Sequence, residues 1–287
     1  MIALFPIVLA TAMANPPALV SFDELARRLA DPAAAASLRI VDVRPRADYD
    51  QGHLPEAVWA DAKAATALAA RPGGLADADA WSAWLAPLAI GPGPEVEVLV
   101  VDGARQLEAA RVWWLLGYLG VPRVGLVDGN MPLWSSQGRP LTAEPTRIAP
   151  RAFPVTLRPD RLATRPEVLT ALGDKSTRVI DARTEAEHTG EKALSRRGGH
   201  IPAACRVEWT DLVAPAGRFL PPSELQAKFA AAGLRPGEPA ISHCQGGGRA
   251  SVDAFVLERL GHPTRNYYLG WSDWGNADET PVIQGKE

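Results

Sequence analysis

The sequence predicts an α/β protein made of two similar domains, each a mainly parallel sheet with helices on both faces. Two observations support this fold class. Short β-branched runs alternate with helix-like stretches along the chain, which is typical of a parallel sheet covered by helices. The same order of motifs also occurs once in each half of the chain, which indicates an internal duplication.

The first shared motif is a strand that ends in Asp-x-Arg and is followed by Gly-His-(Leu/Ile)-Pro-x-Ala. Its first copy, RIVDVRPRADYDQGHLPEAVWAD, spans 39–61, and its second, RVIDARTEAEHTGEKALSRRGGHIPAACRVEW, spans 178–209. The second copy has an eight-residue insertion before its Gly-His pair. His53 and His200 occupy matching places, and we expect both to have structural roles.

The second shared motif is a buried strand, a short polar loop, an amphipathic helix and a glycine that ends the helix. It covers 98–121 and 239–262, and a strand, a Gly turn and a Trp-containing helix start follow each copy. Residues 136–160 contain five prolines and no helical period, which predicts an extended linker. We therefore expect one domain at 17–135 and a second at 161–287.

Composition restricts the kinds of partner. The formal net charge of −3 gives no general attraction to nucleic acid or to anionic membranes. No apolar run reaches the roughly 20 residues that a membrane span needs. The sequence also contains no metal-binding cluster and no nucleotide-binding glycine motif. Any anion site must therefore be local.

The cysteines and the N-terminus bear on the compartment. Cys205 and Cys244, without a Cys-x-x-Cys pair, favour a reducing compartment or a reactive thiol. Residues 1–14 are apolar and end in Ala-Met-Ala, which resembles a signal-peptide cleavage site, but the first basic residue is Arg27 and Pro6 interrupts the run. We expect a cytoplasmic protein, with a periplasmic one as the alternative if 1–14 is a signal peptide.

The most informative stretch is SHCQGGGRAS at 242–251. Cys244 follows a predicted strand, and ligands of open α/β sheets bind at the carboxyl ends of strands. The three glycines that follow allow a tight curl, which turns N–H groups inward into a nest for an anion. A helix beginning near Ala250 adds its positive end, and Arg249 adds a fixed charge. The loop therefore predicts a thiolate beside an anion pocket.

Together these motifs resemble the tandem-domain rhodanese family, whose members include thiosulfate and 3-mercaptopyruvate sulfurtransferases. GHLPEA and GHIPAA resemble one family signature, and ARVWWLLGYLG resembles the helix of the N-terminal domain. GWSDWGN and the Pro-Val after it resemble the C-terminal signature. The resemblance extends from about Leu19 to Val282 and implies two tandem rhodanese-like domains.

The resemblance implies a covalent cycle of sulfur transfer. The Cys244 thiolate takes the outer sulfur of a donor such as thiosulfate, sulfite leaves, and the persulfide passes its sulfur to cyanide or a thiol. No cofactor is expected beyond this Cys244 persulfide. The expected partners are a small anionic donor and a thiophilic acceptor, with a sulfur-accepting protein as a further candidate, and neither nucleic acid nor a membrane.

Several residues around Cys244 are expected to bind the substrate: Arg249, Arg183, Gln245, Gly246, Gly247 and Gly248. We expect the two arginines to clamp the anionic end of the donor. Arg183 has an alternative role, an ion pair with a neighbour such as Asp181 or Glu187. Trp271 and Trp274 are expected to wall the cleft, with burial in the core as their alternative. His243 should point away from Cys244, because successive strand residues face opposite sides.

The first domain departs from the catalytic pattern. Asp102 stands where the repeat places Cys244, and the segment DGARQLEA lacks the glycine cluster. A carboxylate cannot form a persulfide. We therefore expect the first domain to be non-catalytic and to supply part of the wall of an interdomain cleft.

Three other functions remain as alternatives. A 3-mercaptopyruvate sulfurtransferase usually carries a loop of the type Cys-Gly-Ser-Gly-Val, whereas CQGGGR ends in a cation that suits the thiosulfate dianion. A non-enzymatic persulfide carrier or regulatory module would use the same cysteine. A phosphatase of related fold would need a loop one residue longer than Cys244 to Arg249. Sulfur transfer from thiosulfate is the function that we expect.

Overall fold

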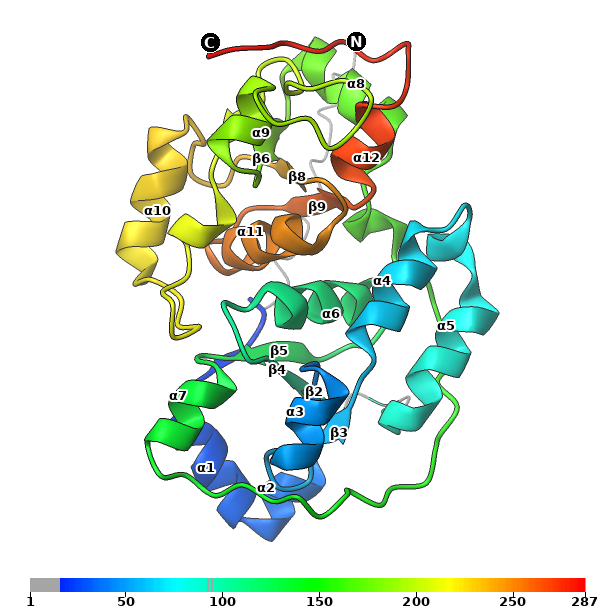
Figure 1. The fold of residues 1–287 in the computed structure, drawn as a ribbon, viewed down its shortest axis with the longest axis vertical. Coiled ribbons are helices and arrows are strands. Elements are labelled where there is room, and N and C mark those ends of the chain that lie inside the picture. Colours follow the sequence, from blue (N-terminus) through cyan, green and yellow to red (C-terminus); the bar gives the residue numbers. More distant parts are fainter. Residues whose placement is uncertain (1–15, 92, 94, 287) are drawn as a thin grey trace, which may run out of the picture.

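The structure is a computed structural model that describes residues 16–91, 93 and 95–286 (Figure 1). The signal-like segment at 1–14 lies outside the described residues. Two α/β units follow one another along the chain, the first in the lower half of Figure 1 and the second in the upper half.

The first unit contains a five-stranded sheet in which every pairing is parallel. Its strand order is β1 (Leu19–Val20), β5 (Val124–Val127), β4 (Glu97–Val101), β2 (Leu38–Asp42) and β3 (Val58–Trp59). Its helices are α1 (Phe22–Ala30), α2 (Pro32–Ala36), α3 (Arg46–Gln51), α4 (Ala62–Ala70), α5 (Ala78–Leu85), α6 (Leu107–Tyr118) and α7 (Met131–Ser136), with 3-10 turns η1 (Gly74–Ala76) and η2 (Ala86–Leu88).

The second unit repeats this arrangement with a four-stranded parallel sheet. Its strand order is β7 (Cys205–Arg206), β6 (Arg178–Asp181), β8 (Ala240–His243) and β9 (Thr264–Tyr267). Its helices are α8 (Arg165–Asp174), α9 (Glu185–Thr189), α10 (Pro222–Ala231), α11 (Gly248–Arg259) and α12 (Gly270–Trp274), with 3-10 turns η3 (Pro159–Arg161) and η4 (Trp209–Asp211). The two sheets therefore share the order that the sequence repeat predicts.

Helices cover both faces of each sheet, because side chains of successive strand residues alternate between the faces. In the first domain Ile40 packs on the side of α1, α3 and α7, whereas its neighbour Val41 packs on the side of α4 and α6. In the second domain Ile241 faces α8 and α12, whereas Ala240 faces α10 and α11. The predicted fold class is confirmed.

The two domains share one continuous hydrophobic core. Helices α6 and α11 lie side by side between the two sheets (Figure 1). Trp113 packs edge-on against Phe255 with ring centroids 5.0 Å apart, and Trp114 stacks on Tyr268 at 4.9 Å. The apolar helix motif of the first domain thus forms a central part of the interdomain contact.

The chain between α7 and η3 runs in an extended form along the first domain (Figure 1). Thr142 pairs with His53 in an antiparallel bridge, and the backbone N–H of Arg151 donates to the carbonyl of Ala86. This course agrees with the extended form expected for 136–160.

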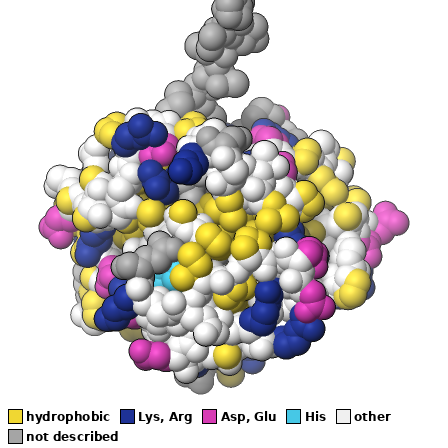
Figure 2. All heavy atoms as spheres, turned by 90° about the horizontal axis from the view of Figure 1, so that it is seen from above, with side chains coloured by type: hydrophobic (Ala, Val, Ile, Leu, Met, Phe, Trp, Pro, Cys, Tyr) yellow, Lys and Arg dark blue, Asp and Glu magenta, His cyan; other side chains and the backbone are white. Residues whose placement is uncertain are grey.

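The surface carries charges of both signs. Figure 2 shows acidic and basic side chains interspersed around a central group of hydrophobic side chains on one face of the molecule. Within residues 16–91, 93 and 95–286, no helix combines the length and apolar character needed to cross a membrane.

Candidate active site

Cys244 lies between the end of β8 and the loop that starts α11. The residue is buried, with 2% of its surface exposed. Its backbone carbonyl accepts a hydrogen bond from the N–H of Trp271 at 2.7 Å, which ties the end of β8 to α12. Gly248 is the first residue of α11, a helix of 12 residues. The positive end of α11 is therefore directed to the loop that bears the thiol.

The three glycines of the loop differ in what they permit. Gly247 has φ +83°, and a Cβ there would lie 2.4 Å from a ring carbon of Tyr268, so only glycine fits. A Cβ on Gly246 would meet open space, and one on Gly248 would meet the guanidinium of Arg111 at 2.3 Å. Gly270, φ +52°, would bring a Cβ to 2.2 Å from the carbonyl oxygen of Cys244. The tight curl therefore depends chiefly on Gly247 and Gly270.

Arg249 has a partner that differs from the expected one. Its Nη1 and Nη2 donate to Oε2 and Oε1 of Glu187 at 2.6 and 2.8 Å. Burial opposes ionisation of Glu187, but hydrogen bonds from Arg249 and Thr184 outweigh it and lower its pKa to about 2. Both terminal nitrogens of Arg249 are thus engaged by Glu187. Each of these nitrogens carries a second N–H, and direct contact of this guanidinium with the donor stays a prediction.

Burial also disfavours the charged form of Arg249, but Glu187 and the nearby Cys244 raise its pKa above the usual value. The guanidinium is therefore a permanent positive charge within electrostatic reach of the thiol. It can favour an anionic sulfur at Cys244 without touching the substrate.

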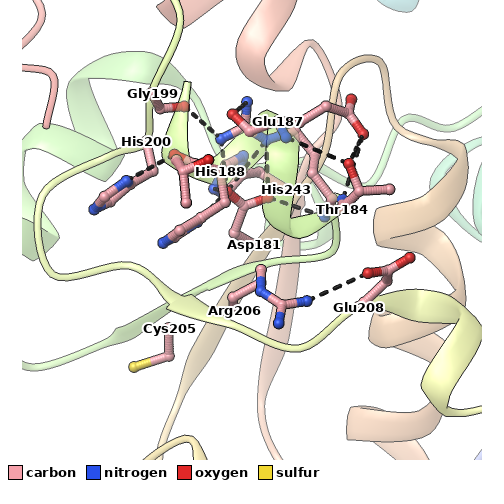
Figure 3. A network of polar contacts seen from close by, with 12 residues as sticks. Asp181, Thr184, Glu187, His188, Gly199, His200, Cys205, Arg206, Glu208 and His243 are labelled. Carbon is pink, nitrogen blue, oxygen red and sulfur yellow. Dashed lines mark hydrogen bonds and ion pairs between the residues drawn. The ribbon is translucent and has the colours of Figure 1, made fainter. Parts of the chain in front are cut away.

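Arg183 belongs to a buried network at the carboxyl end of β6, where Asp181, Glu187 and His188 gather (Figure 3). Asp181 Oδ2 accepts from Arg183 Nη2 at 2.6 Å and lies 2.9 Å from Nδ1 of His188. Arg183 also donates to the carbonyl of Gly199 at 2.9 Å and is only 1% exposed. Arg183 therefore forms an ion pair with Asp181, and its burial leaves it no position from which to clamp a donor.

The first domain contains the same network, which explains why the motif occurs twice. Arg44 Nη2 donates to Asp42 Oδ2 and to the carbonyl of Gly52, both at 2.7 Å. The His53 ring stacks on Tyr49, as the His200 ring stacks on His188, both with centroids 3.8 Å apart. The two histidines are buried in equivalent positions, as a structural role requires.

The two tryptophans expected to wall the cleft lie in the core instead. Trp271 is 1% exposed and Trp274 is fully buried, and both pack in the apolar cluster under β8 and β9. The Trp271 ring also lies 4.3 Å from the guanidinium carbon of Arg183. Their alternative assignment, burial in the core, is the correct one.

Gln245 and His243 flank the cysteine. Gln245 Nε2 donates to Ser195 Oγ at 3.0 Å and to the carbonyl of Leu194 at 3.3 Å, which ties the loop to the 191–198 segment. His243 is fully buried, and burial lowers its pKa to about 4 although Asp181 opposes this shift. A neutral imidazole is therefore present beside the carboxylate of Asp181 at neutral pH.

Arg111, a residue that sequence analysis missed, supports the loop. Arg111 of α6 donates from Nη1 to the carbonyl of Gly246 at 3.0 Å and to the hydroxyl of Tyr268 at 3.4 Å. Arg111 is held by Glu108 at 2.9 Å. The first domain therefore contacts the cysteine loop through a side chain. The signal in the sequence was a single arginine within the otherwise apolar helix motif ARVWWLLGYLG.

Asp253 of α11 is a further missed residue. It is fully buried, and within the part of the chain that the structure describes neither carboxylate oxygen has a hydrogen-bond partner. Burial, with the charges of Cys244 and Asp181, raises its pKa well above the usual value. The neutral form of Asp253 is therefore favoured at this place near the thiol.

A loop of the second domain fills the space at the carboxyl ends of the strands in the first domain. The backbone N–H of Asn130 donates to the carbonyl of Ala216 at 3.0 Å, and Gln106 Nε2 donates to the carbonyl of Gly217 at 2.7 Å. Asp102 is buried beside this loop, and burial raises its pKa to about 6 although backbone N–H groups oppose the shift. The non-catalytic role of the first domain stays a prediction.

A family model for the rhodanese-like domain matches residues 21–137 and 164–277. The chain belongs to the rhodanese family. The recognition made from the sequence motifs is therefore confirmed. Within the described ranges, no group of three or more His, Cys, Asp or Glu side chains is arranged to hold a metal ion.

Similar proteins extend over almost the whole chain. The thiosulfate sulfurtransferase of Pseudomonas aeruginosa is 32% identical over 268 residues, which cover 93% of this chain and 97% of the relative. The thiosulfate sulfurtransferase of Azotobacter vinelandii is 30% identical over 272 residues, with 94% and 98% covered. Among solved structures, SseA of Escherichia coli, described with the rhodanese fold of 3-mercaptopyruvate sulfotransferases, matches with a TM-score of 0.74 at 26% identity, covering 89% of this chain and 99% of that one.

Proposed function

We propose that this rhodanese is a sulfurtransferase that moves the outer sulfur of thiosulfate to a thiophilic acceptor through a persulfide on Cys244. The observation that carries the proposal is the position of Cys244 at the start of the curled loop before α11. Loop N–H groups and the helix end favour an anionic sulfur there. The names of the two thiosulfate sulfurtransferase relatives support the choice of donor.

The proposed first step forms one bond and breaks one. The Cys244 thiolate attacks the outer sulfur of thiosulfate, and the S–S bond of thiosulfate breaks with its electron pair going to sulfite. In the second step an acceptor such as cyanide attacks the outer sulfur of the persulfide, and the electron pair of the Sγ–S bond returns to Cys244. The loop and the Arg249 charge stabilise the anionic persulfide between the steps.

3-Mercaptopyruvate is the second candidate donor, supported by the similarity to SseA. The two donors differ in charge, since thiosulfate is a dianion. Steady-state kcat/KM measured with both donors and cyanide as the acceptor decides between them. A higher value for 3-mercaptopyruvate would overturn the choice of thiosulfate.

Mass spectrometry tests the chemistry. The intact protein should gain one sulfur atom after incubation with thiosulfate and lose it after addition of cyanide. Cys244→Ser should abolish both the mass gain and turnover, because oxygen cannot carry the sulfane sulfur. Cys205→Ser is the matched control, since Cys205 is half-buried in β7, which β6 separates from β8 in the second sheet. Loss of the mass gain in the Cys205 variant would contradict the assignment.

We further propose a cytoplasmic location and acceptance of the sulfur by a thiol. The sequence has two cysteines and no Cys-x-x-Cys pair, which suits a reducing compartment. Fractionation of cells followed by immunodetection tests the location, and detection of the protein in the periplasmic fraction would overturn it.

A further inference from the structure

A cavity of about 670 Å³ opens in the first domain between the carboxyl ends of β2 and β3, helix α4 and the first turn of α6. It is named here the α4 cavity. Its volume lies within the range of about 300–1,000 Å³ that is typical of small-molecule sites. Cyanide has only two atoms and would leave such a space almost empty. The sulfur-transfer chemistry described above does not account for this cavity.

The walls of the α4 cavity are apolar on one side. The indole of Trp59 lines it, and its Nε1 donates to the carbonyl of Arg44 at 2.9 Å, which holds the ring in place. The guanidinium carbon of Arg46 lies 5.3 Å from the ring centroid. On the opposite wall α4 presents small side chains, such as that of Ala67, which leave room for a ligand.

The rim of the α4 cavity is positively charged. Four cations and two carboxylates line it: Arg44, Arg46, Lys63, Arg111, Asp61 and Glu108. The arginines are paired, for example Arg46 with Asp50 at 2.8 Å. Over the described ranges, the ammonium of Lys63 forms no ion pair or hydrogen bond, and the residue is exposed. This ammonium is available to a carboxylate of a ligand.

One wall residue connects the α4 cavity to the cysteine loop. Arg111 lines the cavity and donates to the carbonyl of Gly246, two residues after Cys244. In Figure 1, α4 and α6 lie directly below the second domain, on the side of α11. The α4 cavity is therefore bordered by the same side chain that contacts the cysteine loop.

We propose that the α4 cavity binds the body of the sulfur acceptor, a small peptide-like thiol that carries a carboxylate. The apolar wall takes the body, and Lys63 pairs with the carboxylate. The acceptor thiolate attacks the outer sulfur of the Cys244 persulfide, a new S–S bond forms on the acceptor, and the electron pair of the Sγ–S bond returns to Cys244. This inference rests on the proposed sulfur transfer and adds the class of acceptor.

Two variants test the inference, with glutathione as the probe acceptor and thiosulfate as the donor. Lys63→Glu should raise the KM for glutathione about tenfold or more, because a charge-assisted contact becomes a repulsion. Ala67→Phe should raise it by filling the cavity. Both variants should keep their kcat/KM for cyanide and for the uncharged thiol 2-mercaptoethanol. Lys228→Glu on α10, on the opposite side of the molecule from α4 in Figure 1, is the matched charge control.

A binding measurement separates this inference from the sulfur chemistry. S-methylglutathione cannot accept sulfur, and it should bind the Cys244→Ser protein in calorimetric titration and lose binding in Cys244→Ser/Lys63→Glu. Absence of binding to Cys244→Ser, or equal losses with glutathione and cyanide in Lys63→Glu, would overturn the acceptor site. If the proposed function itself were wrong, no persulfide would form on Cys244 in the wild-type protein or in any variant that keeps this cysteine.

Discussion

Arg249 and Glu187 form a two-point ion pair beside the cysteine loop, with N–O distances of 2.6 and 2.8 Å. The pair joins the start of α11 to α9, and Glu187 also closes the capping box of α9 with Thr184. The partner of Arg249 thus comes from the other motif of the same domain, the one at 178–209. The ion pair with Glu187 therefore fixes the guanidinium of Arg249 beside the cysteine loop.

The first prediction is that Arg249 and Glu187 act as one unit. Arg249→Ala and Glu187→Gln should each lower the free energy of unfolding by about 1.5–3 kcal/mol, because each leaves a mostly buried group without its charged partner. The loss of unfolding free energy in the double variant should be smaller than the sum of the two single losses by at least about 1 kcal/mol. Urea unfolding of the four proteins measures this coupling. Additive losses would show that the pair contributes nothing.

The second prediction separates two neighbouring glycines. Gly247→Ala should lower kcat/KM about 100-fold, since its φ of +83° and the Tyr268 ring force the loop to move. Gly246→Ala should stay close to wild type, because its Cβ would meet open space. Both are measured with thiosulfate and cyanide. Similar losses in the two variants would mean that the curl does not depend on Gly247.

The third prediction concerns the first domain. Asp102→Cys should give no second persulfide, because residues near Gly217 fill the space at the strand ends and Gln106 is engaged with them. The Cys244→Ser/Asp102→Cys protein, treated with thiosulfate, should keep its unmodified mass. A gain of one sulfur atom would show that the first domain retains a working site.

The fourth prediction is a pH dependence of stability due to Asp253. Its pKa is raised in the folded state, so the folded protein binds more protons than the unfolded one above pH about 4, and the contribution of this residue to stability falls as the pH rises. Asp253→Asn should remove this loss, because the amide does not titrate.

The charged or titratable groups that act on Asp253 are Cys244, Asp181, Arg249 and Asp211. Denaturant unfolding of wild type and Asp253→Asn from pH 4.5 to 8 measures the difference in stability. The variant should become more stable relative to wild type as the pH rises. A difference that is constant over this range would contradict a protonated Asp253.

Local patterns in the sequence determined the duplication and the fold class, and they singled out Cys244 as the predicted nucleophile. A strand followed by Cys244 and three glycines predicts a strand-end loop wherever it occurs, because φ freedom and strand polarity are properties of the segment itself. The repeated Asp-x-Arg and Gly-His motifs likewise revealed the duplication, because they can be matched between the two halves of the sequence directly. The two-residue strand β1 at the edge of the first sheet was too short to give a pattern.

The partners of the charged groups were decided only by the tertiary structure. Arg249 meets Glu187 across 62 residues, and Arg111 meets Gly246 across 135. An arginine near a cysteine suggests an anion clamp equally well when it is ion-paired, since its sequence neighbours are the same in both cases. Trp271 and Trp274 likewise became core residues because α12 packs on β8 and β9. Charge pairing and burial depend on distances through space, and these arise only when the two domains and their loops have assembled.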